Sequence, residues 1–263
     1  MEWAAYLGIG ALVGFAAGLL GIGGGVVLVP LLVLVFRAHG LPSEHLLHLA
    51  LGTALAAMVF TSLSSTRAHH RLGGVDWKIA RATSPGMLIG SFAAALVAGY
   101  IPTRPLAVLF TALVFYAATS ILLDIKPSTT RELPGPGGIF TAGALIGAVA
   151  SLLAAGGAFL TIPFLLWCKV PLRRAIGTAA ANGFPIAVAG TAGYVLQGSK
   201  AADVPSPSWG YVYLPALVLV VITSMLAAPL GAWLAHRMPV KHLRTVFALL
   251  LYVFAARMLV GVW

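Results

Sequence analysis

Long runs of apolar residues, separated by short polar breaks, extend along the whole chain. The runs cover about 4–36, 45–66, 79–100, 104–123, 138–168, 175–197, 209–236 and 243–262. A helix needs about 20 apolar residues to cross about 30 Å of hydrocarbon, and most of these runs reach that length. The pattern therefore predicts an all-α fold, that of a polytopic transmembrane helical protein.

Two of the runs, 4–36 and 138–168, are too long for one ordinary membrane span. Glycines interrupt both of them, as Gly21-Ile-Gly-Gly-Gly25 in the first and as Gly156-Gly157 in the second. Glycine weakens a helix and permits a sharp change of direction. Each run is therefore predicted to be a broken helix that forms a hairpin, either re-entrant or fully spanning.

Composition supports the membrane assignment and removes two alternatives. Hydrophobic residues make up 60% of the chain and charged residues 8%, against about 25% charged residues in soluble domains. The net charge of +10 could indicate a nucleic-acid partner, but the Lys and Arg residues lie in short segments between apolar runs. We therefore expect no nucleic acid to bind. The single cysteine, Cys168, allows no intrachain disulfide.

The distribution of Lys and Arg predicts the topology, because cytoplasmic loops of membrane proteins are enriched in both. If each oversized run crosses once, the two sides hold seven and eight of these residues. If each run enters and returns, the division is twelve against three, and the three are Arg37, Arg104 and Lys200. The larger asymmetry favours the returning hairpin. This arrangement predicts a multi-pass protein of the cytoplasmic (inner) membrane with both termini outside.

The chain also contains an internal repeat. The stretch 14–30 matches 147–163 at its first Gly, at Leu-Leu, at Gly-Gly and at the final Pro. Gly52-Thr53-Ala54 then matches Gly177-Thr178-Ala179, and 101–110 matches 238–247. We expect a first transmembrane repeat at 1–123, a linker at 124–137 and a second repeat at 138–263. Three spans and one hairpin in each half make the two repeats inverted, as in many secondary transporters.

In these motifs the chain resembles the sulfite exporter TauE/SafE family of membrane permeases. The resemblance rests on the order and duplication of the Gly-rich hairpin that ends near a Pro and of the later Gly-Thr motif. It implies export of sulfite, a sulfonate or a related organosulfur compound. The second hairpin carries a weaker glycine cluster, Ala154-Ala155-Gly156-Gly157-Ala158, than the first.

The glycine breaks are the first candidate site for a small anionic substrate. The N–H groups at a helix start have no intrahelical acceptor, and the helix dipole adds partial positive charge there. Such a start binds an oxyanion without a buried cation. Close helix packing is the alternative, because small residues are common at membrane interfaces. The predicted substrate-binding residues in the breaks are Gly23, Gly24, Gly25, Gly156 and Gly157.

Three polar side chains complete the predicted substrate site: Thr53, Thr178 and Asn182. The threonines occupy equivalent positions in the two repeats, and Asn182 follows Thr178 by four residues, on the same helix face. An amide inside a membrane span needs a partner or a function. Threonine can instead bond its own helix backbone.

Other ionisable residues are expected to lie away from this site. His69 and His70 are expected in a solvated loop, and Arg257 near its helix end is expected to extend to the membrane interface or to attract anions there. The six carboxylates fall in loops or at span ends. We therefore expect no catalytic residue, no metal and no cofactor, and no conventional site for a coupling proton or cation.

The leading functional hypothesis is a secondary transporter of a small anion in the lipid bilayer. The alternatives are a passive anion channel or facilitator, and a membrane subunit that passes sulfur compounds to a soluble enzyme. Sulfite could itself carry a coupling proton, because it is a weak acid. Substrate, direction, coupling ion and a possible homodimer remain open.

Overall fold

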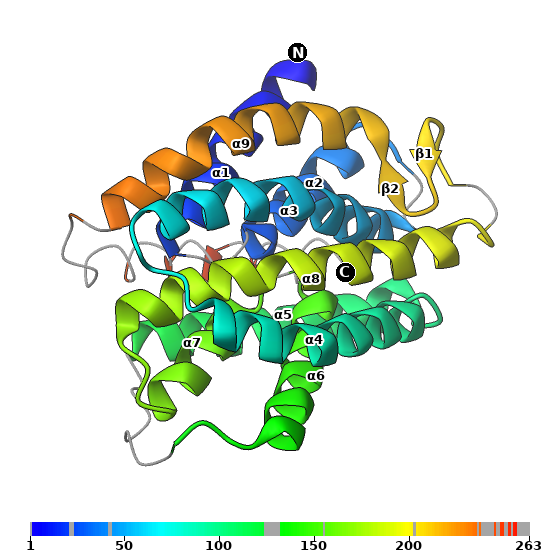
Figure 1. Ribbon diagram of the computed structural model, residues 1–263. Coiled ribbons are helices and arrows are strands. Elements are labelled where there is room, and N and C mark those ends of the chain that lie inside the picture. Colours follow the sequence, from blue (N-terminus) through cyan, green and yellow to red (C-terminus); the bar gives the residue numbers. More distant parts are fainter. Residues whose placement is uncertain are drawn as a thin grey trace.

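A computed structural model describes residues 2–20, 24–41, 44–123, 132–154, 156–201 and 204–235, and residues 237, 245, 248, 249, 252, 253, 255 and 256 near the C-terminus. The described chain is almost entirely helical (Figure 1). The helices are α1 (Glu2–Leu20), α2 (Gly25–Ala38), α3 (Leu46–Arg71), α4 (Trp77–Ala98), α5 (Thr103–Leu122), α6 (Pro136–Leu152), α7 (Ala158–Trp167), α8 (Leu172–Gly198) and α9 (Leu214–Ala235). A short antiparallel hairpin, β1 (Ser208–Trp209) and β2 (Val212–Tyr213), precedes α9.

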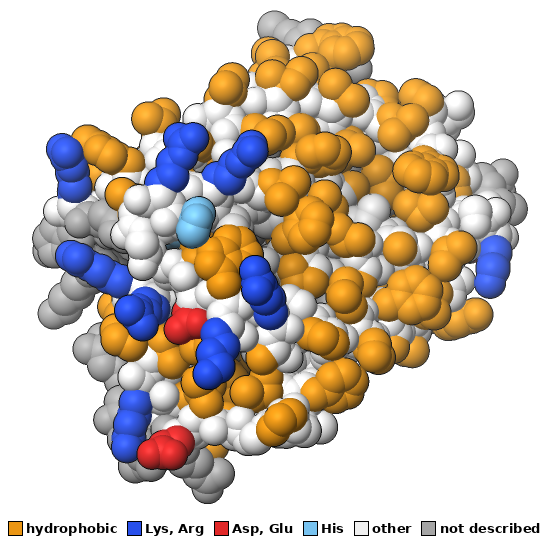
Figure 2. All heavy atoms as spheres, in the orientation of Figure 1, with side chains coloured by type: hydrophobic (Ala, Val, Ile, Leu, Met, Phe, Trp, Pro, Cys, Tyr) orange, Lys and Arg blue, Asp and Glu red, His pale blue; other side chains and the backbone are white. Residues whose placement is uncertain are grey.

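The predicted fold class, a polytopic helical membrane protein, is confirmed. In the described residues, α3, α5, α8 and α9 are each long and apolar enough to cross a membrane. Large apolar side chains also face outward, as at Leu226, Leu145 and Ile89. Figure 2 shows them over most of the visible surface, with Lys and Arg gathered at one end. A surface of this kind is suited to lipid.

The two oversized apolar runs, 4–36 and 138–168, are broken at the glycine clusters, as the sequence predicted. α1 ends at Leu20 and α2 begins at Gly25, while α6 ends at Leu152 and α7 begins at Ala158. Gly24 precedes α2 with φ 73°, and Gly157 precedes α7 with φ 72°. Both angles lie in the left-handed region, which glycine adopts without a steric cost.

Helices α3 and α8 cross the centre of the molecule side by side and run antiparallel. A Cβ atom added to Gly52 of α3 would lie 3.2 Å from the Cβ atom of Tyr194, and one added to Gly183 of α8 would lie 3.4 Å from that of Ser62. The main hydrophobic core takes most of the buried apolar side chains of α3, and Ala179, Ile186, Ala187 and Tyr194 of α8. These two helices therefore form the support for the remaining elements.

The hairpin helices pack across the boundary between the predicted repeats. α1 lies along α9, and α6 lies along α4, on opposite sides of the α3–α8 pair (Figure 1). Both contacts are close because glycines line them. A Cβ atom on Gly14 of α1 would lie 2.3 Å from the carbonyl oxygen of Ser224, and one on Gly90 of α4 would lie 2.0 Å from that of Ala144.

Charge distinguishes the two ends of the helix bundle. At one end, here called the basic end, α3 and α9 finish and α4 and α8 begin (Figures 1 and 2). Its described Lys and Arg residues are Arg67, Arg71, Lys78, Arg81, Lys169, Arg173, Arg174 and Arg237. The opposite end holds Arg37, Arg104 and Lys200. α1 runs in the direction of α9, toward the basic end, and α2 returns to Arg37 at the opposite end.

Two sequence predictions in this region are wrong. The run 209–236 was expected to be helical from its start, but β1 and β2 occupy 208–213, with Gly210 in a left-handed turn at φ 55°. His69 was expected in a solvated loop, but α3 continues to Arg71 and buries His69 to 1% exposure. Its Nε2 lies 3.1 Å from the carbonyl oxygen of Gly18 in α1. The span 243–262 lies mostly outside the described residues, as does Arg257.

Candidate functional site

The two helix breaks meet near the middle of α3 and α8. A Cβ atom on Gly25, at the start of α2, would lie 1.6 Å from the carbonyl oxygen of Ala154, in the second break. The Cβ position of Gly183 in α8 lies 3.8 Å from Gly156 Cα. Segments about 130 residues apart in the sequence therefore form one close contact, which the absence of side chains at the glycines allows.

Both breaks present the start of a helix without a side-chain cap. Gly24 and Gly157 are the N-cap residues of α2 and α7, and neither helix start receives a side-chain hydrogen bond. The Gly157 carbonyl accepts from the N–H groups of Leu160 and Thr161, at 3.0 and 2.7 Å. The N–H groups of Ala158 and Phe159 come earlier in the first turn of α7 and have no acceptor within the helix. Gly25 and Val26 have the same positions in α2.

Asn182 lies on the face of α8 that contacts the second break. Its side chain is 0% exposed. The hydroxyl of Thr83 in α4 donates to Asn182 Oδ1 at 3.1 Å, while Asn182 Nδ2 has no hydrogen-bond partner among the described residues. One turn later on the same face, Ile186 Cδ1 lies 2.8 Å from the Cβ position of Gly157. Asn182 therefore keeps a buried amide donor without a partner among the described residues, and its neighbours Gly183 and Ile186 contact the second break.

Thr161 adds a hydroxyl to the same region. It lies one turn into α7 and is buried, and its Oγ1 is 3.5 Å from the Cβ position of Gly157. Among the described residues this oxygen has no hydrogen-bond partner. Donors that are buried without a partner cost free energy unless a ligand or water binds them. The second break thus combines backbone N–H groups, an amide and a hydroxyl.

The two predicted threonines have other partners. Thr53 Oγ1 accepts a hydrogen bond from the N–H of Tyr213 at 2.9 Å, and Thr178 Oγ1 accepts one from the N–H of Asp76 at 3.0 Å. The first bond lies near the start of α9 and the second near the start of α4. Their contact with a substrate stays a prediction.

Of the predicted site residues, the structure brings the two breaks with Gly24, Gly25, Gly156 and Gly157 together, and Asn182 directly precedes Gly183, which contacts Gly156. Gly23 lies outside the described residues. Sequence reasoning missed Thr83 and Thr161. Both are hydroxyl residues inside apolar runs, and Thr161 follows Gly157 by one helical turn, which was a usable signal.

The charge of the site comes from dipoles rather than from ionised side chains. Every Lys and Arg among the described residues is exposed. The described part of the chain also holds no group of three His, Cys, Asp or Glu side chains that could bind a metal ion. An anion at the breaks would therefore be bound by N–H groups and helix dipoles.

Comparison with known proteins gives consistent matches over nearly the whole chain. Residues 6–258 match the family described as sulfite exporter TauE/SafE. A probable membrane transporter protein of Haemophilus influenzae is 36% identical over 252 residues, which cover 95% of each chain. The probable membrane transporter protein YdhB of Bacillus subtilis is 30% identical over 245 residues, 90% of this chain and 92% of the relative. No solved structure matches the chain.

Proposed function

The chain belongs to the sulfite exporter TauE/SafE family of membrane transporters, and from this premise we propose that it is a secondary transporter that exports a small anion. The proposed substrate is sulfite, a sulfonate or a related organosulfur compound, carried across the cytoplasmic membrane. The observation that carries the proposal is the contact of the uncapped start of α2 with the break that precedes the uncapped start of α7.

The proposed binding mode uses donors that fit an oxyanion. The N–H groups of Ala158 and Phe159 and the Thr161 hydroxyl lie in the first turn of α7, and the Asn182 amide, which has no partner among the described residues, directly precedes Gly183, which contacts the second break. Oxygens of a sulfur oxyanion accept such hydrogen bonds, and the dipoles of α2 and α7 favour a negative charge. Binding through dipoles rather than through a buried cation also leaves the anion able to dissociate.

We also propose that the two halves are inverted repeats, with the breaks as equivalent elements. Several paired features support this proposal: the similar φ angles of Gly24 and Gly157, the prolines inside α2 and α7, and the matching hydrogen bonds of Thr53 and Thr178. α3 and α8 also run in opposite directions. Transporters built in this way bind substrate where the broken helices meet.

Sulfite flux into vesicles that contain the purified chain tests the function. A transporter gives flux that saturates with sulfite concentration, whereas a passive channel gives flux that rises without saturation. Asn182→Leu should raise the half-saturating concentration by roughly tenfold or more, because a hydrogen bond to a charged group contributes about 1.5–3 kcal/mol. Flux in everted and right-side-out vesicles would give the direction.

Gln197→Leu is the matched control for the loss of an amide from α8. Gln197 Nε2 already donates to the carbonyl oxygen of Leu96 at 2.8 Å, so its removal should affect stability and leave the half-saturating concentration unchanged. If Asn182→Leu transports sulfite with the parent's half-saturation, the proposed site is wrong. If the parent protein carries neither sulfite nor methanesulfonate, the proposed substrate class is wrong.

A further inference from the structure

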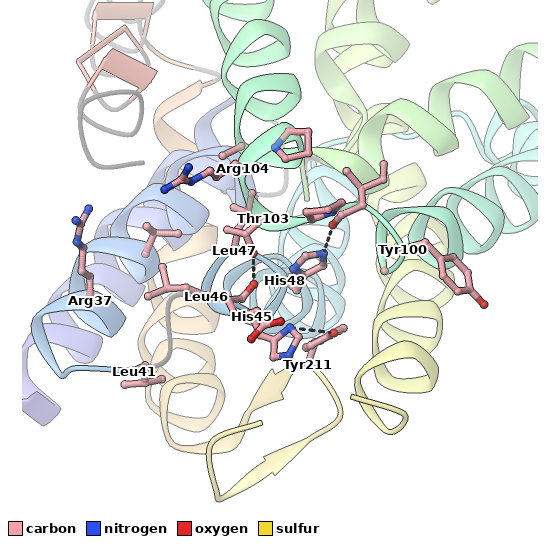
Figure 3. A pocket seen from close by; sticks show the side chains of 17 residues that line it. Arg37, Leu41, His45, Leu46, Leu47, His48, Tyr100, Thr103, Arg104 and Tyr211 are labelled. Atoms are coloured by element: carbon pink, nitrogen blue, oxygen red, sulfur yellow. Dashed lines mark hydrogen bonds between the residues drawn. The ribbon is translucent and has the colours of Figure 1, made fainter. Parts of the chain in front are cut away.

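A pocket of about 710 Å³ opens at the end of the molecule opposite the basic end. The end of α2, the start of α3, the α4–α5 connection and the residue that precedes β2 surround it (Figure 3). Its volume lies within the range of about 300–1,000 Å³ that is usual for small-molecule sites. Along α2, Arg37 at this pocket is about 18 Å from Gly25 at 1.5 Å per residue, so the pocket is separate from the helix breaks.

Positive charge is concentrated at this pocket. Of the three Lys and Arg residues at this end of the described chain, Arg37 and Arg104 both line the pocket, whereas Lys200 does not. The two arginines come from α2 and α5 and lie on the same side of the pocket (Figure 3). Among the described residues of the lining, Glu44 is the one carboxylate. Arginine presents several N–H donors in a plane, a geometry that matches the oxygens of sulfate, sulfonate or phosphate groups.

A rigid polar wall faces the arginines. His48 Nε2 lies 3.1 Å from the carbonyl oxygen of Ala98 and 3.0 Å from that of Ile101, so this nitrogen carries hydrogen and donates to both. His48 Nδ1 is then an acceptor, and it is buried without a partner among the described residues. The ring of Tyr211 lies 5.2 Å from that of His48.

Tyr211 supplies a phenol to the same wall. Its hydroxyl is 3.3 Å from His45 Nδ1. Burial, and then the nearby Glu44 carboxylate, raise the pKa of Tyr211, so the phenol keeps its proton at neutral pH and remains a hydrogen-bond donor.

We propose that this pocket is a second oxyanion-binding site, in addition to the helix breaks. Arg37 and Arg104 bind the charged oxygens, and the Tyr211 phenol lies on the opposite wall. His48 Nδ1 accepts from a ligand that carries a hydroxyl or acid proton, such as hydrogensulfite. The same chemistry fits a soluble oxyanion and the phosphate of a lipid headgroup, because the pocket lies at the end of the membrane spans. The proposal does not depend on transport of sulfite.

Equilibrium binding of radiolabelled inorganic sulfate to the purified full-length chain tests the pocket. Arg37→Gln and Arg104→Gln should each weaken sulfate binding at the pocket by about tenfold, and the double variant should abolish binding at the pocket. Arg104→Lys should have a smaller effect, because it keeps the charge and loses the planar donor geometry. Lys200→Gln removes a cation from the same end without touching the pocket, so it should bind sulfate like the parent.

Two further measurements separate the possible sources of the oxyanion and the two sites. The first measurement uses nanodiscs that contain phosphatidylglycerol. If this lipid competes with sulfate in the parent and the double variant does not retain the lipid, the occupant of the pocket is a lipid phosphate. If sulfate binding is lost in the double variant and phosphatidylglycerol does not change sulfate binding in the parent, the occupant is a soluble anion. Asn182→Leu should retain sulfate binding at the pocket. A double arginine variant that binds both sulfate and phosphatidylglycerol like the parent would overturn the proposal, whatever the result of the sulfite flux assay.

Discussion

The hydroxyl of Thr178 accepts a hydrogen bond from the backbone N–H of Asp76, 3.0 Å away. Asp76 is the N-cap of α4, and its carboxylate accepts from the N–H groups of Lys78 and Ile79. Thr53 makes the corresponding bond to Tyr213, directly before α9. Each threonine of the repeated Gly-Thr-Ala motif therefore fixes the start of a helix that belongs to the other predicted repeat.

Thr178→Val should lower the free energy of unfolding by about 0.5–1.5 kcal/mol, because the partly buried Asp76 N–H loses its acceptor. Thr178→Ser keeps the hydroxyl and should retain most of the stability. Denaturation in detergent micelles measures both. If Thr178→Val keeps the parent's stability and instead raises the half-saturating sulfite concentration, the threonine acts on the substrate.

Gly157→Ala should destabilise the protein by about 1–2 kcal/mol, since a side chain is disfavoured in the left-handed region that Gly157 adopts at φ 72°. Gly137→Ala is the control, because its Cβ atom would meet nothing within 4 Å. Unfolding curves of the two variants give the comparison. Equal stability of both variants would mean that the break tolerates another backbone conformation.

Gly14→Ala should separate α1 from α9. Its Cβ atom would lie 2.3 Å from the carbonyl oxygen of Ser224, so the backbone must shift, and overpacking of this kind costs about 1–3 kcal/mol. Gly8→Ala lies in the same helix with open space around its Cβ atom and should be neutral or slightly stabilising. A melting temperature for Gly14→Ala as high as that of Gly8→Ala would contradict the observed packing.

Leu72→Cys and Lys200→Cys should react with a membrane-impermeant thiol reagent from opposite sides of the membrane. Leu72 lies beside the basic end, and Lys200 lies at the opposite end. Both changes are made in a Cys168→Ala background, because Cys168 is a free thiol. The charge bias predicts that position 72 is cytoplasmic. Labelling of both positions from one side would refute the hairpin topology.

The sequence was sufficient to predict a helical membrane fold and the two helix breaks, because length and glycine content are local properties. It also singled out Asn182, which the structure shows to be buried, because an amide inside a span is unusual; its contact with a substrate stays a prediction. It could not show that Thr83 is the partner of Asn182, because that contact joins residues 99 positions apart. His69 was misplaced because nothing in its neighbourhood indicated that α1 would cover the last turn of α3.

The pocket at the opposite end shows the same limit. Charge counting separated Arg37, Arg104 and Lys200 from the other cations, but it gave no reason to place two of them together. Arg37 and Arg104 line the same pocket because α2 returns from the break to the end of the molecule where α5 begins. The return of α2 could be predicted from the hairpin. The position of α2 relative to α5 is set by tertiary packing, which the sequence pattern does not show.

The packing of α1 against α9 has a consequence for how the protein is made. At about 5–20 residues per second of synthesis, the roughly 190 residues between the two helices delay the arrival of α9 by about 10–40 s. During that interval the glycine-lined face of α1 lacks its partner α9. The first helix to be synthesised can therefore take its final place only after most of the chain has been made.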